Sequence, residues 1–383
     1  MKYLNLKYTC CLTICFLSLY VTAQVHKVGP HGNPSALQTA DTTRRVRGLA
    51  DTVGFAHRKE QMDLVIQRID QNQGPRLDAI RKKYDISSGD AWRLAIAPHD
   101  DYSYSGYMYP LVLKNVQAKT VIIFGVAHKA AKFGVSNQLV FDHYTHWNGP
   151  YGPIKVSSMR EDIMKELPVG TYQINDSLQA AEHSVEAELP FLQYFNKDVE
   201  IISILVPPMP FSRMNELAEP LARALARVFK KRDMEWGVEV SLLISTDAVH
   251  YGDEDWSGRD FAFFGPDSTG FHQAVDTEHV FIQNTLAGDL LPAKIQKFAR
   301  YTVQENDYTA YKWTWCGRYS VPMGMLTAYN LQQVQKATPL NGMFLDYCTS
   351  IDHTPIQVDD TGMGVTGKAS IRHWVGYCDV VFR

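Results

Sequence analysis

Short apolar runs alternate with amphipathic stretches along the chain after residue 92. Four of these runs are rich in β-branched residues and short enough to be buried strands, at 94–97, 120–124, 200–206 and 240–245. Apolar residues recur at helical spacing between or beside them, at 105–116, 157–167, 185–195 and 215–231. This alternation predicts a three-layer α/β/α fold, in which helices cover both faces of a mostly parallel or mixed sheet.

The alternation continues towards the end of the sequence without a repeat or a linker. Further helices are predicted at 277–286, 291–303 and 321–335, followed by strands at 343–350 and 374–382. Residues 93–383 therefore form one predicted domain. Within it, residues 252–270 are rich in Asp, Gly and Phe and indicate a long loop, which in compact domains is usually a lid or a binding element.

The first 24 residues have the pattern of an export signal. Lys2 and Lys7 give a positive start before an apolar stretch at 9–20, and Val21-Thr22-Ala23 forms a cleavage site before Gln24. The apolar stretch is too short to span a bilayer comfortably, so we expect no stable membrane span after cleavage. The signal predicts a secreted or periplasmic protein.

Residues 25–92 form a predicted N-terminal extension. Its first half is polar and has no clear period, whereas residues 58–83 carry apolar residues among many charges. This second pattern predicts one or two surface helices, with a break near Gly74-Pro75.

The composition is that of a globular protein, with 45% hydrophobic and 21% charged residues. The net charge is −3 and no basic run occurs, which argues against nucleic acid as a partner and leaves a small-molecule or peptide ligand open. Signal cleavage would leave the cysteines Cys316, Cys348 and Cys378. Cys348 and Cys378 both lie in predicted strands and are candidates for a disulfide, with Cys316 as the free thiol.

Side chains of the types that bind metals follow three of the predicted strands. His99 comes directly after a proline at the end of one strand, His128 follows the next after a glycine turn, and Asp247 and His250 follow a third. The carboxyl ends of parallel strands lie at one edge of a sheet, so these residues can converge. Cys316 lies just before a predicted helix, whose dipole and N–H groups favour a thiolate.

Two imidazoles and a thiolate form a ligand set for zinc, copper or iron. With Asp247 in place of the thiolate, the set becomes the two-histidine, one-carboxylate triad of non-haem iron oxygenases. The alternative is that these are scattered loop residues, because the chain has no compact ligand motif such as HExxH. The residues alone leave these interpretations open.

Two neighbouring groups bear on the candidate site. Glu182 and His183 either open a predicted helix, with Ser184 as its N-cap, or lie beside the metal ligands and orient one of them. Four tyrosines can line a pocket next to His99, namely Tyr102, Tyr104, Tyr107 and Tyr109. Six other histidines are interpreted as structural, namely His143, His146, His272, His279, His353 and His373.

Five segments, taken in order, resemble those of the Memo family, also named AmmeMemoRadiSam system protein B. They are APHDDYSYSG at 97–106, FGVAHK at 124–129, EHSVE at 182–186, STDAVHYG at 245–252 and CGR at 316–318. The resemblance implies a fold related to the class III extradiol ring-cleaving dioxygenases. It also implies a metal site at His99, His128 and Cys316, with Asp247 and His250 in the same pocket, and a connection with copper or iron and redox chemistry.

The sequence departs from the family pattern beside the first ligand. Asp100 and Asp101 stand where the family has Ala-Gly, and Lys129 stands where it has a second histidine. We therefore expect two added carboxylates, either facing the pocket or on its solvated surface. Tyr102 follows them in the same segment and is a further candidate for the pocket wall.

Together, these segments predict an exported protein that binds one transition metal ion, iron or copper before zinc. Its expected activity is that of a metal-dependent redox or dioxygenase-like enzyme. In this prediction Asp247 orients a ligand and His250 moves protons. The alternatives are a non-catalytic module that holds a metal, a peptide or a glycan, and a metal-dependent hydrolase.

Overall fold

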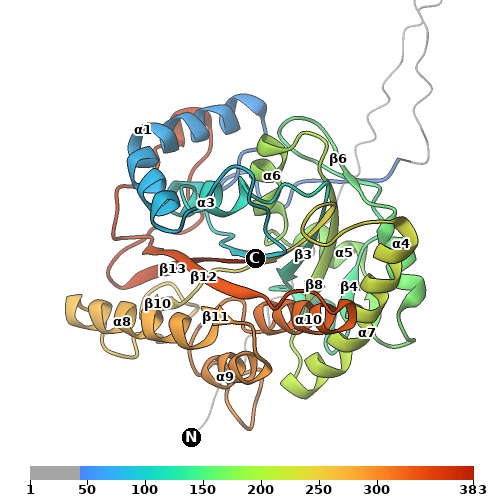
Figure 1. Ribbon diagram of the computed structural model, residues 1–383. Helices are drawn as coiled ribbons and strands as arrows, with labels where there is room; N and C mark the ends of the chain where they lie inside the picture. Colours follow the sequence, from blue (N-terminus) through green and yellow to red (C-terminus); the bar gives the residue numbers. More distant parts are fainter. Residues whose placement is uncertain (1–43) are drawn as a thin grey trace, which may run out of the picture. The chain divides into compact units, whose positions relative to one another are not determined.

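A mixed sheet runs through the structure, a computed structural model that describes residues 44–383 (Figure 1). Its strand order is β1-β5-β6-β8-β3-β9-β2-β13-β12-β11, with β4 beside β8, β7 beside β4, and β10 beside β13. The strands are β1 (Val46–Arg47), β2 (Leu94–Ala97), β3 (Thr120–Val126), β4 (Leu139–Phe141), β5 (His146–Trp147), β6 (Ile154–Val156), β7 (Tyr172–Ile174), β8 (Glu200–Val206), β9 (Val240–Ser245), β10 (His250–Gly252), β11 (Gly288–Asp289), β12 (Asn341–Thr349) and β13 (His373–Phe382).

The four strands predicted first lie side by side and parallel, in the order β8, β3, β9, β2. Successive side chains of each strand point to opposite faces, so Val121 and Ile123 of β3 pack into one hydrophobic core while Ile122 and Phe124 pack into another. Burial on both faces explains why these strands are continuous apolar runs in the sequence.

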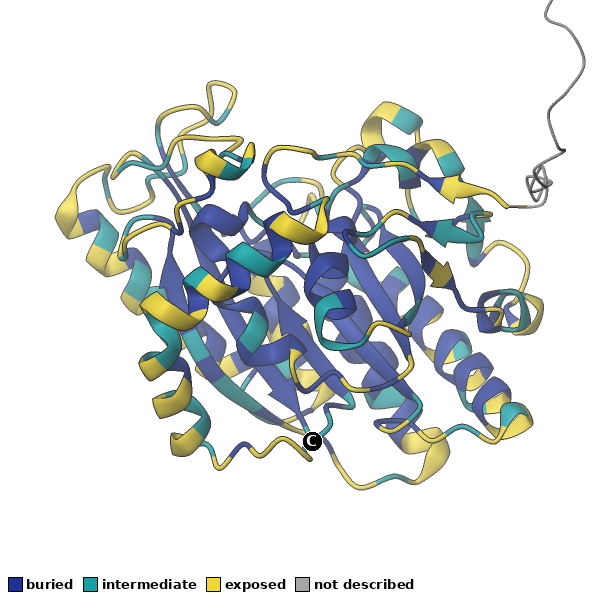
Figure 2. Ribbon diagram, turned by 90° about the horizontal axis from the view of Figure 1, so that it is seen from above, coloured by how far each residue is buried: buried dark blue, intermediate teal, exposed yellow. Residues whose placement is uncertain are grey.

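Helices cover both faces of the sheet, with α1, α3 and α6 on one side and α7, α8, α9 and α10 on the other (Figure 1). Figure 2 shows the central strands buried and the helices exposed mainly on their outer sides. The helices are α1 (Lys59–Lys83), α2 (Tyr102–Ser105), α3 (Tyr109–Leu113), α4 (Met159–Glu166), α5 (Asp176–Ala181), α6 (Leu189–Phe195), α7 (Phe211–Arg232), α8 (Ser268–Thr285), α9 (Pro292–Thr302) and α10 (Ser320–Gln335). The predicted three-layer α/β/α fold with a mixed sheet is confirmed.

Several predicted boundaries are wrong. The strand predicted at 120–124 continues to Val126, so Gly125 lies inside β3 and not in a turn. The break predicted near Gly74-Pro75 is absent, because α1 is one helix that contains Pro75. Buried Ile69 and Leu77, one on each side of the proline, hold both halves of α1 on the same core. The helix predicted at 277–286 begins earlier, at Ser268, and shortens the predicted loop.

The N-terminal part of the described chain joins the sheet through β1, which pairs in parallel with β5 at one edge. Arg47 of β1 is buried, and its guanidinium pairs with the carboxylate of Glu186 and donates to the carbonyl of Gln179 at 3.0 and 3.1 Å. The signal predicted at 1–24 lies outside the described residues. Among residues 44–383, no helix combines the length and the apolar composition needed to cross a membrane.

The predicted disulfide does not form, since Cys348 and Cys378 are both free thiols. In the antiparallel pair β12–β13, Cys348 lies opposite Tyr377 and Cys378 lies opposite Tyr347. The two cysteines therefore occupy successive register positions and point into opposite cores. Predicted strands alone cannot reveal this, because the faces depend on the register between them.

Candidate metal centre

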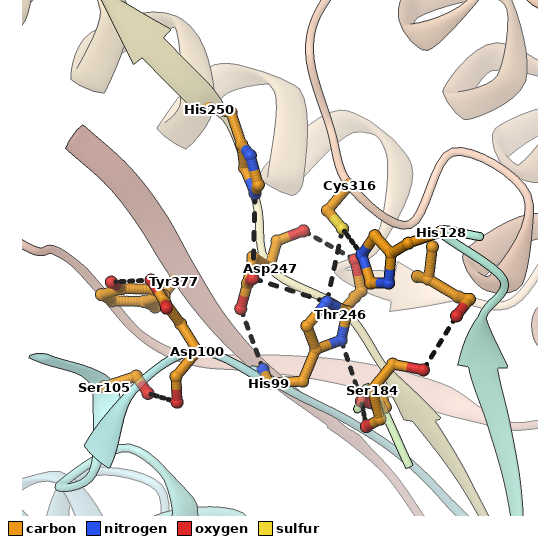
Figure 3. A network of polar contacts seen from close by, with 12 residues as sticks. His99, Asp100, Ser105, His128, Ser184, Thr246, Asp247, His250, Cys316 and Tyr377 are labelled. Atoms are coloured by element: carbon orange, nitrogen blue, oxygen red, sulfur yellow. Dashed lines mark hydrogen bonds and ion pairs between the residues drawn. The ribbon is translucent and has the colours of Figure 1, made fainter. Parts of the chain in front are cut away.

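Three of the predicted site residues lie at one edge of the sheet because three neighbouring parallel strands end there. His99 comes two residues after β2, His128 two residues after β3, and Asp247 two residues after β9. The strands are adjacent in the order β3, β9, β2, so the three side chains come together although they are far apart in sequence. Figure 3 shows His99 and His128 with Cys316, and Asp247 between His99 and His250.

Cys316 reaches this edge from the loop before α10. A Cβ atom on Gly317 would lie 2.1 Å from Thr246 Oγ1, so only glycine lets this loop pack directly on the residue that follows β9. Cys316 Sγ then lies 3.1 Å from His128 Nε2 and 3.3 Å from His99 Nε2. His99, His128 and Cys316 each offer one ligand atom within 4.8 Å of the other two.

The surrounding hydrogen bonds determine which nitrogen of His99 carries the proton. Ser245 Oγ lies 2.5 Å from the carbonyl of Ser184, to which it donates its single proton. Ser245 Oγ therefore accepts from His99 Nδ1, 3.0 Å away. The proton on Nδ1 leaves Nε2 with a lone pair that faces Cys316.

Glu182 orients His128 in the same way. Its Oε2 accepts from His128 Nδ1 at 3.0 Å and its Oε1 accepts from the Lys129 backbone N–H at 2.5 Å. Burial acts to raise the pKa of Glu182, but the hydrogen bond from His128 and the charges nearby outweigh it and hold the pKa below its ordinary value. An ionised Glu182 fixes the His128 ring and makes its free Nε2 a stronger ligand.

The Glu182–Ser184 segment lies against β3 because of Gly125. A Cβ atom there would lie 2.6 Å from Val185 and 2.7 Å from Ser184 Oγ. Ser184 Oγ donates to the Val126 carbonyl at 2.9 Å and caps no helix, so the helix-start interpretation of this serine is wrong. The next helical turn begins only at Glu186.

The donor set fits a transition metal ion. A Cys316 thiol has one proton and can donate to only one of the two facing Nε2 atoms, whereas a metal ion among the three atoms would accept both lone pairs and the sulfur. Burial raises the pKa of the Cys316 thiol well above its ordinary value and lowers the pKa of His99 to about 3. A neutral imidazole is the form that binds metals, and a bound cation would deprotonate the thiol.

Asp247 and His250 lie beside this set. Asp247 Oδ1 accepts from the His99 backbone N–H at 2.9 Å, and its Oδ2 lies 3.5 Å from His99 Nε2 and 3.8 Å from His250 Nε2. Burial acts to raise the pKa of Asp247, but the two imidazoles and these hydrogen bonds outweigh it and lower the pKa to about 2. The His250 side chain is 27% exposed, so it is open to solvent on one side.

A cavity of about 520 Å³ adjoins these residues. Both added carboxylates line it and both have partners, because Tyr377 donates to Asp100 at 2.6 Å and the Thr366 backbone N–H donates to Asp101 at 2.5 Å. Burial and the negative charge of Asp247 raise the pKa of Asp100 to about 6. Burial and the negative charge of Asp100 raise the pKa of Asp101 to about 7. The cavity is lined by His99, Asp100, Asp101, Tyr104, His128, His183, Asp247, His250, Asp255, Trp256, Ser350, Thr366, Gly367, Lys368, Ala369, His373 and Val375.

The expectation for Tyr102 is wrong, because its ring is buried in the core and its hydroxyl donates to the Ala187 carbonyl at 2.6 Å. His183 lies at the cavity wall, where its ring stacks on that of His128 with the centroids 4.7 Å apart. Of the four tyrosines proposed for the pocket, Tyr104 alone is part of the lining.

Trp256, His373 and Ser245 also belong to the site, although the sequence does not predict them as site residues. Trp256, from the predicted loop, stacks on His373 at 4.1 Å and lies 5.1 Å from His250, centroid to centroid. His373 had been interpreted as structural, and only the pairing of β10 with β13 brings it to the cavity. Ser245 did have a signal, since it precedes Asp247 by two residues and can point to the same side of the strand.

Comparison with known proteins places the chain in a family. A family model described as Memo-like protein matches residues 54–364, which include α1 as well as the five segments. A MEMO1 family protein of Pyrococcus abyssi is 29% identical over 162 residues, 41% of this chain and 52% of the relative. A MEMO1 family protein of Methanothermobacter thermautotrophicus is 29% identical over 165 residues, 42% of this chain and 54% of the relative. The aligned segments span about half the length of these relatives. The family model, in contrast, matches most of this chain, and the chain therefore belongs to the Memo-like protein family.

Proposed function

We propose that this protein binds one transition metal ion through His99 Nε2, His128 Nε2 and Cys316 Sγ. The observation that carries the proposal is the hydrogen bonding behind the two rings. Ser245 and Glu182 engage both Nδ1 atoms, so both Nε2 lone pairs face the same sulfur. Nitrogen and sulfur ligands of this kind suit copper, iron or zinc.

The proposed activity is metal-dependent redox chemistry on a small substrate in the adjoining cavity. A bound iron or copper ion would supply electron transfer that no side chain of the site can provide. Asp247, fixed by the His99 backbone N–H, orients polar groups of the substrate. His250 lines the cavity and is partly exposed, so it can accept a proton from the substrate or donate one to it. The segment at 1–24 adds the proposal that this activity belongs outside the cytoplasm.

Metal uptake tests the site. The folded protein is freed of metal with a chelator, reloaded separately with Fe²⁺, Cu²⁺ and Zn²⁺, and its metal content is measured. We expect His99→Ala and Cys316→Ser each to lose one equivalent relative to the parent protein. His272→Ala is the matched control, because His272 is an exposed histidine of α8 outside the cavity. Equal uptake by all four proteins would refute the site.

Oxygen consumption tests the activity. With ascorbate as electron donor, the iron- or copper-loaded protein should consume dioxygen, and His250→Ala should abolish this while it retains the metal. Tight metal binding without consumption would instead support a non-catalytic module. Activity that requires zinc and proceeds without oxygen uptake would support a hydrolase.

A further inference from the structure

A second group of metal-binding side chains lies at the end of β12, outside the centre described above. Cys348 belongs to the strand, and Asp352 and His353 follow in the next turn. Each of the three offers one ligand atom within 4.8 Å of the other two. The sequence analysis interprets His353 as structural, and the structure places it among these metal-binding types of side chain.

Hydrogen bonding determines the tautomer of His353. Its Nε2 lies 2.8 Å from the carbonyl oxygen of Tyr104, which can only accept, so Nε2 carries a proton. In a neutral ring Nδ1 then carries a lone pair and no proton. This Nδ1 atom lies 2.8 Å from Asp352 Oδ1, which is also an acceptor. Two acceptors at this distance repel each other, so either the ring is protonated and pairs with Asp352, or a metal ion lies beside both atoms.

The neighbours of the cluster hold its side chains in place, and no arginine or lysine among residues 44–383 pairs with Asp352. Asp352 Oδ2 accepts from the Thr349 backbone N–H at 2.8 Å, which fixes the carboxylate. Arg76 acts on the Cys348 thiol through its charge, but its guanidinium pairs with Asp346 at 2.6 Å. Arg76 also donates to the Tyr107 hydroxyl at 3.4 Å, and that hydroxyl lies 3.4 Å from His353 Nδ1. Among the described residues, His353 is therefore the ion-pair partner that Asp352 has, and no arginine or lysine pairs with this carboxylate.

Burial is graded across the cluster. Cys348 is 1% exposed and the His353 side chain 7%, whereas the Asp352 side chain is 34% exposed. An ion can therefore enter past Asp352 and reach a sulfur that is shielded from other thiols. One sulfur, one imidazole nitrogen and one carboxylate oxygen are a ligand set typical of zinc, with water as the fourth ligand.

We propose that Cys348, Asp352 and His353 bind a zinc-class divalent ion, independently of the first centre. Binding releases the proton of the Cys348 thiol to solvent as the metal–sulfur bond forms. The ion also joins the turn after β12 to the backbone of Tyr104, whose side chain lines the cavity.

Cobalt(II) tests this proposal, because a thiolate ligand gives bound cobalt a charge-transfer band in the near ultraviolet. The experiment uses the chain without residues 1–24, which carry Cys10, Cys11 and Cys15, and with Cys316→Ser, so that only Cys348 or Cys378 can produce the band. We expect about one equivalent of cobalt with the band in Cys316→Ser, and loss of the band in Cys316→Ser/Cys348→Ser. Cys316→Ser/Cys378→Ser is the matched control and should keep the band, because Cys378 points into the opposite core.

Two milder variants guard against misfolding of the Cys348 variant. In Asp352→Asn the amide oxygen still accepts from Thr349, and in His353→Gln the amide N–H still reaches towards the Tyr104 carbonyl. In the Cys316→Ser background, each should weaken cobalt binding more than about 100-fold, since a lost ligand costs more than a lost outer-shell partner. Absence of the band from Cys316→Ser, or binding unchanged by both variants, would overturn the proposal and leave an imidazolium–carboxylate pair.

The two proposals fail in different ways. If the first centre were absent, the parent protein and Cys316→Ser would take up equal amounts of cobalt. If the second were absent, Cys316→Ser would lack the band whatever the parent protein binds.

Discussion

Ser245→Ala tests whether the tautomer of His99 controls metal binding. The substitution removes one hydroxyl group that accepts from His99 Nδ1 and donates to the Ser184 carbonyl. It changes no ligand atom. We therefore expect two separate effects, one on the free energy of unfolding and one on the metal dissociation constant.

The size of each effect follows from burial. His99 is 1% exposed and Ser184 is fully buried, so water cannot replace the lost partners. A buried polar group left unpaired costs about 1–3 kcal/mol, and two are left here, so the free energy of unfolding should fall by at least about 2 kcal/mol. Loss of an outer-shell partner weakens metal binding about 10- to 100-fold.

Ser241→Ala is the matched control. Ser241 lies on the same strand, is equally buried, and donates to the Trp92 carbonyl at 2.8 Å, away from the site. Urea unfolding of the metal-free proteins should show a loss of stability in both variants. Zinc titration against a competing chelator should show weaker binding in Ser245→Ala alone. Equal dissociation constants for the two variants would refute the proposed role of Ser245.

Three further predictions concern buried residues of the protein. Arg47→Met should lower the free energy of unfolding by about 3–5 kcal/mol in urea, because it leaves Glu186 as a buried carboxylate without its cation; a loss below about 1 kcal/mol would contradict this. Burial raises the pKa of Glu278 from 4.5 to about 7, although two tryptophans donate to it. The folded protein thus holds this proton more tightly than the unfolded chain, so the free energy of unfolding should fall as pH rises from about 4.5 to 7, and this slope should be smaller in Glu278→Gln. Alkylation of the denatured protein without reductant, followed by peptide mapping, should find Cys316, Cys348 and Cys378 all modified, whereas a linked Cys348–Cys378 peptide would contradict the opposite-face arrangement.

The central strands and the convergence of the site could be predicted from the sequence because both depend on local pattern. A strand buried on two faces is a continuous apolar run, and the residue that follows it lies at a known edge of the sheet. That reasoning brings His99, His128 and Asp247 together. Cys316 is a candidate ligand from its place before a predicted helix, but strand order does not bring it to this edge, because its loop reaches the edge through the close contact of Gly317 with Thr246.

The remainder depends on register and on hydrogen bonds that no local pattern encodes. His250 lies opposite Val375 only because β10 pairs with β13, more than a hundred residues later in the chain. The opposite faces of Cys348 and Cys378 follow from the register of β12 with β13. Likewise, a serine after an apolar run does not reveal that its proton goes to Ser184 and that it must accept from His99.

Asp100 and Asp101 mark the clearest departure from the family pattern, and the structure gives them a defined place. Asp101 is buried, so the interpretation of the pair as solvated surface is wrong. Tyr377 donates to Asp100 and Thr366 donates to Asp101. Neither aspartate belongs to a possible metal-binding group among residues 44–383. The pair therefore changes the cavity wall and leaves the three ligand atoms as they are. A relative with Ala-Gly at these positions would present the same ligands to a wall without carboxylates, so the two proteins should differ in the charge and polarity of their substrates more than in their metal.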